Sequence, residues 1–444
     1  MTMMLRLLFL QMLIMILTLG CDDSSTSSTD TEQAGTEITS NEDMVAGIDG
    51  SEGMDSGMSQ GGESLAGESS AGESSAGESS AGESSAGTNT IDMGGEVAGE
   101  VAGIEATGGS TSEVNWRAGI PLPEGRSSHT ATRIDENKVL IVGGAGPSEA
   151  TLSSSIIFDA ENNRFDQQGS MANFREGHTA LLLDNGKVLV VGGNIWAPLS
   201  SAELFDPSQG LWQSTESTSV PRAGHTMTKL DDGRVIVIGG TNAEVTTEIF
   251  QPEEGNWTNG PNLIYGRAQH AAVKLSDGRI LILGGVGESG LPIKKVEIYN
   301  PIDNTMTEAA DMNVTHFRTT ATLLDDGRVL VAGSLRSEND FAAEVYDPEE
   351  DTWTMTGELN VSRYTHKAVR LAGGKVLVIG GYNPLDYKLS STEIWDPNTG
   401  IWSYSGELIM GRDEHTVTVL SDRIMVIGGR GPMGATPDVE VFFF

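Results

Sequence analysis

The sequence predicts an all-β fold, a β-propeller in which seven four-stranded antiparallel sheets are packed as blades around a central axis. Three observations carry this prediction. An arginine recurs at intervals of 45–49 residues, a Gly-Gly pair follows it after 17 or 18 residues, and each repeat holds four short strand-like segments without a helical period. A fixed period of this length is typical of stacked supersecondary units. Radial packing of such sheets also leaves few exposed edges.

Composition limits the classes of partner and site. The 444 residues include 63 acidic and 27 basic side chains, for a formal net charge of −36, and a single cysteine. A polyanion of this kind is a poor partner for nucleic acid or for an anionic lipid surface. One cysteine excludes internal disulfides and cysteine-rich zinc sites. We therefore expect no nucleic-acid partner, no metal and no cofactor.

Residues 1–20 predict a signal peptide. Arg6 is followed by an apolar run from Leu7 to Leu19, which is too short to cross a bilayer comfortably. The segment 17–21 resembles a bacterial lipobox, although Thr18 and Leu19 depart from its pattern, and the resemblance implies that Cys21 is lipidated. An ordinary cleaved signal peptide or a buried thiol is the alternative. With lipidation, the protein is expected in the bacterial cell envelope, attached to the bilayer only through the acyl anchor and facing the periplasm or the exterior.

Residues 21–113 predict the lipidated cysteine followed by a disordered linker. Positions 22–113 contain 20 acidic side chains and neither lysine nor arginine, and Ala-Gly-Glu-Ser-Ser pentads recur between 66 and 86. Such a segment buries too little apolar area to offset its ordering entropy. We expect it to act as a tether, whereas an acidic cation-binding tail is the alternative interpretation.

The folded region, 114–444, is defined by four recurring positions. The arginine position is occupied by His316 in the fifth repeat, and Ser334 replaces the second glycine there. The arginines are Arg126, Arg175, Arg222, Arg267, Arg363 and Arg412. An acidic position follows at Glu203, Glu248, Glu297, Glu344, Glu393 and Glu440, with Ile156 in the first repeat. Nine residues later stands a bulky residue: Phe165, Trp212, Trp257, Met306, Trp353 and Trp402.

One repeat illustrates the four expected strands. Residues 225–230 form a short segment with β-branched Thr226 and Thr228, and Asp232-Gly233 provides a tight turn. Residues 235–238 are apolar on both faces and must be covered on both sides. The third strand starts at Glu248 and the fourth carries Trp257. The seventh repeat stops before a fourth strand, but Trp116 lies ten residues before Arg126, the interval seen elsewhere. The segment around Trp116 is therefore expected to complete the last blade and close the ring.

Together, Arg-x-x-His, the Gly-Gly pair, Glu-x-aromatic-Asp-Pro and the later tryptophan resemble kelch repeats. The resemblance covers 114–444 and implies the propeller fold, but not an activity, because one such fold hosts many functions. It also implies that the first strands line the central channel. On that basis seven histidines are expected around the channel mouth: His129, His178, His225, His270, His316, His366 and His415.

Two interpretations of these repeated polar residues remain open. The histidines are either a ligand ring or hydrogen-bonding partners of their own or neighbouring blades. The arginines and glutamates are either ion pairs that join the repeats or a site for carboxylates or sugars. A metal shared between blades is disfavoured, because ring-related side chains diverge beyond ligand distances.

The connections between second and third strands vary most in length, so we expect the face that carries them to be the recognition surface. Their aromatic and basic side chains are the candidate ligand-binding residues. These are Trp196, Tyr382, Tyr387, Arg336, Lys294, Lys295 and Arg430.

The predicted function is a non-enzymatic, membrane-tethered, monomeric binding or scaffold module for a protein or glycan. The alternative, implied by the resemblance, is a kelch-type sugar epimerase or mutarotase acting at the channel mouth. The copper site of galactose oxidase needs a tyrosine cross-linked to cysteine, and Cys21 lies in the anchor. The fifth repeat departs most from the pattern, at His316, Arg318, Thr319 and Ser334, so it is the expected place of any catalytic centre.

Overall fold

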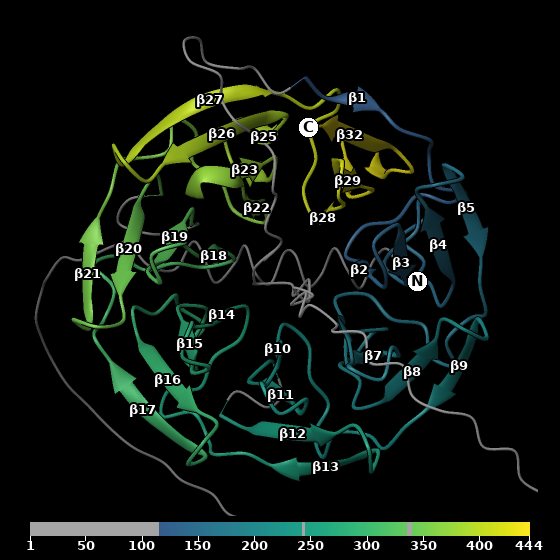
Figure 1. Cartoon of the computed structure of the whole chain (residues 1–444), viewed down its shortest axis with the longest axis horizontal. Helices are drawn as coiled ribbons and strands as arrows, with labels where there is room; N and C mark the ends of the chain where they lie inside the picture. Colours follow the sequence, from purple (N-terminus) through teal and green to yellow (C-terminus); the bar gives the residue numbers. More distant parts are fainter. Residues whose placement is uncertain (1–114, 242–244, 335–339) are drawn as a thin grey trace, which may run out of the picture. The chain divides into compact units, whose positions relative to one another are not determined.

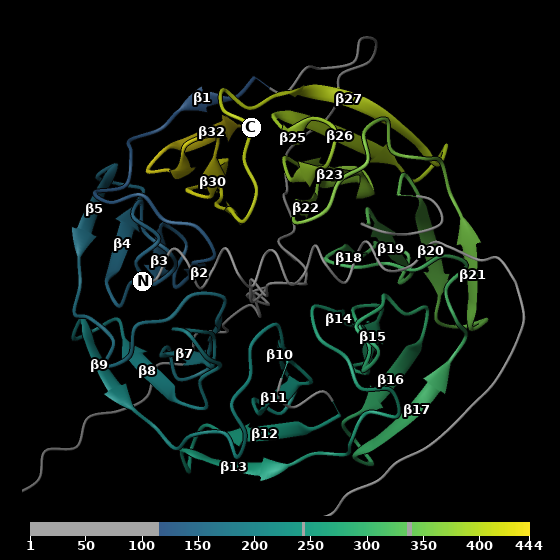
Figure 2. The ribbon, with the colours of Figure 1, turned by 180° about the vertical axis from the view of Figure 1, so that it is seen from behind.

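A computed structural model describes residues 115–241, 245–334 and 340–444. The signal segment, Cys21, the linker and Arg336 lie outside the described residues. Within the described residues, seven four-stranded antiparallel sheets surround a common centre, with the first strand of each sheet innermost (Figures 1 and 2). The predicted seven-bladed propeller is confirmed. No helix in the described part of the chain is long and apolar enough to cross a membrane.

The first four blades follow the repeats directly. Blade 1 comprises β2 (Thr130–Arg133), β3 (Lys138–Val142), β4 (Ser155–Asp159) and β5 (Arg164–Gln167). Blade 2 comprises β6 (Thr179–Leu182), β7 (Val188–Val191), β8 (Ala202–Asp206) and β9 (Leu211–Ser214). Blade 3 comprises β10 (Thr226–Lys229), β11 (Val235–Ile238), β12 (Thr247–Gln251) and β13 (Asn256–Asn259). Blade 4 comprises β14 (Ala271–Lys274), β15 (Ile280–Leu283), β16 (Val296–Asn300) and β17 (Thr305–Ala309).

The last three blades include two extra hairpins. Blade 5 comprises β18 (Thr320–Leu323), β19 (Val329–Ala332), β20 (Ala343–Asp347) and β21 (Thr352–Met355). Blade 6 comprises β22 (Lys367–Arg370), β23 (Val376–Ile379), β26 (Ser391–Asp396) and β27 (Ile401–Glu407), with the short helix η1 (Ala372–Gly374) after β22 and the hairpin β24 (Tyr382–Asn383) and β25 (Tyr387–Lys388). Blade 7 comprises β28 (Thr416–Val419), β29 (Arg423–Ile427), β32 (Val439–Phe443) and β1 (Arg117–Ala118), with the hairpin β30 (Arg430–Gly431) and β31 (Gly434–Ala435).

Apolar second strands form the core between blades. Each residue of β11, Val235–Ile238, is fully buried. This is expected from the sequence, because four consecutive apolar residues place apolar side chains on both faces of the sheet. One face of a second strand packs against the preceding blade and the other against the following one. Val235 and Val237 lie in a cluster with blade 2, whereas Ile236 and Ile238 lie in a cluster with blade 4. The core is therefore a series of layers between neighbouring blades.

The Gly-Gly pairs mark the points where neighbouring blades meet most closely. Gly192 and Gly193 have φ values of 63° and 87°, in the left-handed region that favours glycine. A β-carbon on Gly192 would lie 2.5 Å from the carbonyl oxygen of Arg222 in the next blade. A side chain at this position would push two blades apart.

The ring is closed by its two ends, as predicted. β1 pairs with β32, with Arg117 opposite Val441 and Ala118 opposite Glu440, and Figure 1 shows β1 on the outer rim of blade 7. The Trp116 side chain is 8% exposed and its ring centroid lies 6.1 Å from that of Phe442. Trp116 thus packs between blades 6 and 7 in the manner of an outer-strand tryptophan.

Replacing Trp116 by alanine is expected to lower the free energy of unfolding by about 3–5 kcal/mol, the usual cost of truncating a buried tryptophan. Chemical denaturation of the full chain measures the change. Trp196→Ala is the matched control, because Trp196 is 88% exposed and its loss should change stability by no more than about 0.5 kcal/mol. Equal effects of the two substitutions would contradict closure through Trp116.

Candidate functional site

In six blades a buried arginine stands where the chain enters the first strand, and it holds the ends of the loop between the second and third strands. Arg175 Nη1 donates to the carbonyl oxygens of Gly192 (2.7 Å) and Ser201 (3.0 Å), and its Nη2 pairs with Glu203 (2.8 Å). Glu203 also accepts the backbone N–H of Ala172, at 2.7 Å. The same ion pair joins Arg222 to Glu248, Arg267 to Glu297, Arg363 to Glu393 and Arg412 to Glu440. These side chains are between 0% and 3% exposed and are committed to the scaffold.

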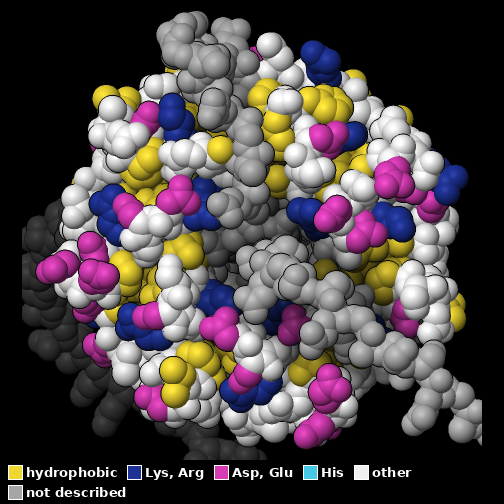
Figure 3. All heavy atoms as spheres, viewed as in Figure 1, with side chains coloured by type: hydrophobic (Ala, Val, Ile, Leu, Met, Phe, Trp, Pro, Cys, Tyr) yellow, Lys and Arg dark blue, Asp and Glu magenta, His cyan; other side chains and the backbone are white. Residues whose placement is uncertain are grey.

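The expectation that arginine and glutamate pairs join neighbouring repeats is wrong, because both partners of each pair belong to one repeat. Other ion pairs do join blades, and three of them involve the turns between first and second strands, at the opposite edge of the sheets. Lys229 of blade 3 pairs with Asp184 of blade 2 at 2.5 Å, and Lys274 of blade 4 pairs with Asp231 of blade 3 at 2.8 Å. Figure 3 shows basic and acidic side chains side by side around one face of the ring.

Blade 1 keeps the arginine without the carboxylate. Arg126 donates to the carbonyl oxygen of Gly143 at 3.0 Å and to Ser154 Oγ at 3.2 Å, while Ile156 occupies the acidic position. Burial lowers the pKa of Arg126 to about 10, and Glu124 partly opposes the shift. Hydrogen bonds to neutral acceptors therefore suffice to hold the loop in this blade.

Six histidines follow the arginines by three residues, and the structure places them between adjacent blades. His178 Nε2 lies 2.9 Å from Thr130 Oγ1 of the preceding blade, and His225 Nε2 lies 2.8 Å from Thr179 Oγ1. The contact recurs between His270 and Thr226, between His366 and Thr320, and across the closure between His129 and Thr416. His415 faces blade 6, where Lys367 takes the place of the threonine. All six side chains are at most 3% exposed, and no histidine reaches the part of the face visible in Figure 3.

The surroundings of these histidines keep them neutral. Burial, followed by the charge of Arg222, lowers the pKa of His225 to about 3. Burial and the neighbouring arginine likewise lower the pKa of the other five well below the ordinary value. A neutral imidazole that is shielded from solvent and bonded to a threonine of the next blade is a structural link, not a ligand presented at the channel mouth.

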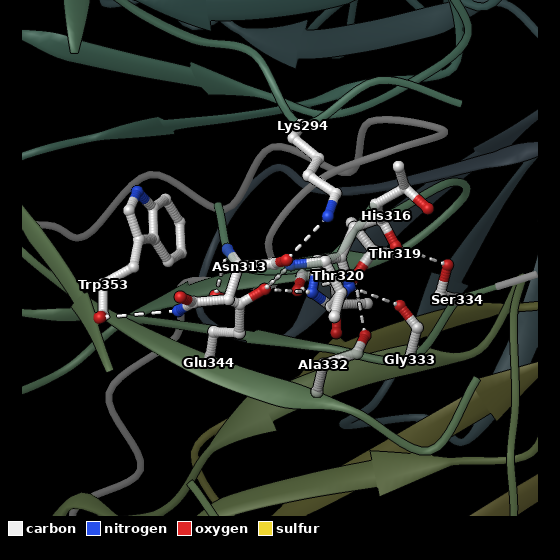
Figure 4. Close-up of polar contacts among 12 residues, drawn as sticks. Lys294, Asn313, His316, Thr319, Thr320, Ala332, Gly333, Ser334, Glu344 and Trp353 are labelled. Atoms are coloured by element: carbon white, nitrogen blue, oxygen red, sulfur yellow. Dashed lines mark hydrogen bonds and ion pairs between the residues drawn. The ribbon is translucent and has the colours of Figure 1, made fainter. Parts of the chain in front are cut away.

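In the fifth blade, other side chains make the contacts that the arginine and the histidine make in the other blades (Figure 4). His316 occupies the arginine position, with Nδ1 3.0 Å from the carbonyl oxygen of Gly333 and Nε2 3.2 Å from Glu344 Oε1. Burial acts to raise the pKa of Glu344, but hydrogen bonds from His316 and from backbone amides outweigh it, so the pKa is lowered. Thr319, in the histidine position, donates to the carbonyl oxygen of Ala332 at 2.6 Å. His316 is 0% exposed and is not part of the histidine ring.

Candidate ligand-binding residues in the described part of the chain all lie in loops between second and third strands. Trp196 and Tyr387 are 88% and 66% exposed, whereas Tyr382 is half-buried. Lys295 pairs with Asp311 at 2.8 Å, which leaves less of its charge for a ligand. Lys294 donates to the carbonyl oxygen of Asn313 at 2.8 Å, and Arg430 lies 3.9 Å from Glu414. These residues occur in blades 2, 4, 6 and 7 and do not converge on one point.

Loop tips expose large apolar side chains, which the sequence analysis identified only in part. Four of the five such loops that are fully described carry one. The loop-tip residues are Trp196 (88% exposed), Leu291 (62%), Leu385 (83%) and Met433 (97%). These side chains stand on loops that differ from blade to blade, so they are available for contact with a partner on this face.

A second feature missed by the sequence analysis is a ring of backbone in the left-handed conformation at the channel mouth. The residue two positions after each arginine position has φ between 51° and 63°, although only two of the seven are glycine. This mouth ring consists of Ser128, Gly177, Gly224, Gln269, Arg318, Thr365 and Glu414. The backbone N–H of Ser128 donates to the carbonyl oxygen of Glu414 (3.0 Å), and that of Gly177 to Ser128 (2.9 Å). Left-handed geometry at non-glycine residues is strained and is retained where a site or a contact requires it.

Blades 6 and 7 depart most from ring symmetry in this region. The ring centroids of Tyr364 and Tyr382 lie 5.3 Å apart, and Tyr387 meets Tyr382 edge-on at 6.2 Å. Lys388 lies over Tyr382 and forms a very short ion pair with Asp413. Burial, followed by the charge of Glu414, raises the pKa of Asp413 despite its lysine partner. The result is an aromatic and charged cluster beside the channel mouth.

Comparison with known proteins agrees with this geometry. The profile of the kelch motif matches residues 363–408, which span the arginine of blade 6 to the end of its outer strand. The chain is a seven-bladed β-propeller whose sixth blade carries a kelch motif.

A fungal alcohol oxidase of the AA5 family, solved in complex with copper, is similar in structure to this propeller, with a TM-score of 0.63, 16% identity, and coverage of 75% of this chain and 76% of that one. YjhT is also similar, with a TM-score of 0.51, 16% identity, and coverage of 64% and 99%. At this level of identity the similarity concerns the fold alone. None of the curated protein sequences is significantly similar to the chain.

The residues of this propeller do not fit a copper centre of the kind held by the fungal oxidase. Within the described residues, no three histidine, cysteine, aspartate or glutamate side chains are grouped as metal ligands. The six histidines that follow the arginines by three residues lie between neighbouring blades, and five of them form a hydrogen bond with a threonine. We therefore derive no step through copper.

Proposed function

We propose that the protein is a membrane-tethered binding module that recognises a polypeptide or a glycan through the face carrying the loops between second and third strands. Two kinds of observation support this proposal. The repeated arginines, histidines and glutamates are buried and engaged in holding the scaffold. The side chains that differ from blade to blade are the ones that reach solvent at the loops, as expected of a rigid scaffold with variable binding loops.

The single observation that carries the proposal is the set of loop-tip residues. Trp196, Leu385 and Met433 belong to three different blades, and each is at least 83% exposed. Exposing such side chains to water is unfavourable, and burying them against a partner contributes about 25 cal/mol per Å² of apolar area. A partner that spans several blades would bury all of them at once, so a polypeptide or a glycan-bearing surface fits better than a small solute.

Sugar epimerisation at the channel mouth has weaker support. His316 replaces the arginine in the fifth blade, where a catalytic centre was expected. Its side chain is inaccessible to solvent and is hydrogen-bonded to Glu344. Arg318 lies on the mouth ring and donates to Gln269 Oε1 at 3.0 Å. An acid–base role needs a group within hydrogen-bond reach of the substrate, and His316 does not meet that condition.

Capture from an envelope extract tests the recognition face. Full-length protein carrying Trp196→Ala, Leu385→Ser and Met433→Ser is expected to capture at least tenfold less of whichever component the wild type retains, because three protruding contacts are lost. The control carries Leu211→Ser, Ile302→Ser and Ile401→Ser, residues that are 59–90% exposed at the opposite edge of the sheets. Capture should survive in the control. Equal loss in both variants, or loss in neither, would refute the proposed face.

Tethering is proposed from Cys21 and the acidic segment that follows it. Cells supplied with radiolabelled palmitate are expected to label the wild-type protein and to leave Cys21→Ala unlabelled, and the alanine variant should move from the membrane fraction to the soluble fraction. One acyl chain alone binds membranes reversibly, so the fractionation is done without detergent and in salt that screens repulsion between the acidic chain and anionic lipids. An unlabelled wild-type protein would show that the module is not lipid-anchored through this cysteine.

A further inference from the structure

A cavity of about 270 Å³ lies at the seam where the last blade meets the first. Its apolar lining comes from Ile120, Phe158, Met425, Val439, Val441 and Phe443, and its polar lining from Arg117, Asn163 and Arg423. Asn163 lies in the turn between β4 and β5, and Arg423 begins β29, so both are at the edge of the sheets opposite the variable loops. The cavity is thus a different place from the proposed recognition face.

Two features of the sequence explain why a cavity occurs at this seam. The outer strand of blade 7 is β1, which pairs over two residues only, whereas the outer strands of the other blades are four to seven residues long. In blades 2, 3 and 5 a tryptophan of the outer strand donates its indole N–H to the chain that enters its blade. Trp212 Nε1, for example, donates to the carbonyl oxygen of Gly169 at 3.1 Å, and Trp353 Nε1 to that of Ala310 at 2.8 Å. Blade 1 has the smaller Phe165 at this position, and its ring stacks on Phe158 at 5.2 Å.

Charge at the cavity is opposite in sign to that of the protein as a whole. Arg423 is held in place by two hydrogen bonds to Asp422, at 2.8 and 2.7 Å, and lies 4.8 Å from the ring centroid of Phe443. Arg117 is exposed, and no carboxylate of the described residues pairs with it. A guanidinium beside an apolar cavity recognises a carboxylate through two parallel hydrogen bonds.

We propose that this seam cavity binds a small amphipathic carboxylate, with the carboxylate on Arg117 and an aryl or alkyl body against Phe158, Met425 and Val441. The volume is near the lower end of that of small-molecule pockets. A ligand in this position touches β1, β32 and blade 1 together, so it fastens the strand that closes the ring. Since it binds the closed ring and not the unfolded chain, it raises the temperature of unfolding.

The test uses the full chain with 4-phenylbutyrate as the probe and 4-phenylbutyramide as its uncharged counterpart. Saturation-transfer NMR and thermal unfolding should detect the carboxylate, and the amide should bind at least fivefold more weakly. Arg117→Gln should weaken the carboxylate at least fivefold, because the substitution removes the charge at an exposed position that the fold does not need. Arg328→Gln alters a half-buried arginine of blade 5 that pairs with Asp326, far from this seam; it is the control and should leave binding unchanged.

Phe165→Trp provides a second, independent variant. It restores the residue type found in blades 2, 3, 5 and 6. Because Phe165 stacks on Phe158 of the cavity lining, the larger ring is expected to narrow the cavity, weaken the NMR signal and raise the unfolding temperature in the absence of ligand. Failure of the wild type to bind 4-phenylbutyrate at millimolar concentration would overturn the proposal. Binding that is equal in wild type, Arg117→Gln and Phe165→Trp would also overturn it, since the probe would then lie elsewhere.

Discussion

Lowering the pH from 7 to 5.5 is expected to reduce the free energy of unfolding by about 8 kcal/mol, because six buried histidines stay neutral in the folded protein. Their pKa values are lowered by burial, to about 3 for His225, whereas an unfolded histidine has a pKa of about 6.5. Below pH 6.5 the unfolded chain therefore binds more protons than the folded one. This stability is fully present above pH 6.5 and is lost progressively as the pH falls toward the folded pKa.

Urea denaturation at pH values from 7.5 to 5 measures this effect. The slope of unfolding free energy against pH should approach that of six protons near pH 5.5, where most carboxylates are still ionised. His225→Gln should reduce the limiting slope by one proton while leaving the other five in place. A free energy of unfolding that is constant between pH 7 and 5.5 would show that the histidines are accessible and titrate in the folded state.

Glu393→Ala is expected to lower the free energy of unfolding by about 3–5 kcal/mol, the cost of leaving one partner of a buried ion pair uncompensated. Glu393 pairs with Arg363 at 2.7 Å and accepts the backbone N–H groups of Asn360 and Val361 at 2.7 and 3.1 Å. Its removal leaves a guanidinium with 0% exposure and no carboxylate. Denaturation at pH 7.5 gives the change directly.

Two variants make the interpretation of Glu393→Ala specific. Glu407→Ala removes an exposed carboxylate from the same blade and should cost no more than about 0.5 kcal/mol. Replacing both partners, as Arg363→Met with Glu393→Met, should recover part of the loss, since a buried pair can often be exchanged for apolar groups. A double variant that is less stable than Glu393→Ala would indicate that the guanidinium itself holds the loop.

The ring architecture could be predicted from the sequence because each repeat carries its own local determinants. Gly192 and Gly193 mark the contact between blades, consecutive β-branched residues mark the second strand, and Asp-Gly turns fix the hairpins. Closure was predictable because the missing outer strand of the last repeat and Trp116 at the start are complementary. The glycine pairs, the second strands and the turns depend on short-range sequence alone, whereas closure follows from comparing the first and last repeats.

The roles of the repeated polar residues depend on geometry between blades and could not be predicted in full. That His178 meets Thr130 of the preceding blade follows from the rotation between neighbouring sheets, which the spacing of residues does not encode. Arg175 and Glu203 were correctly paired, but the pair lies within one blade. The mouth ring was not recognised because its seven residues share a backbone conformation rather than a chemical type.

The most direct test asks whether the repeated histidines belong to the scaffold or to a solvent-facing site. NMR of protein labelled in the imidazole nitrogens should show six neutral rings whose shifts do not change from pH 8 down to the onset of unfolding. Six titrations with midpoints near pH 6.5 in the folded protein would contradict that result, and would return the histidines to the channel mouth as groups available for ligand binding or proton transfer.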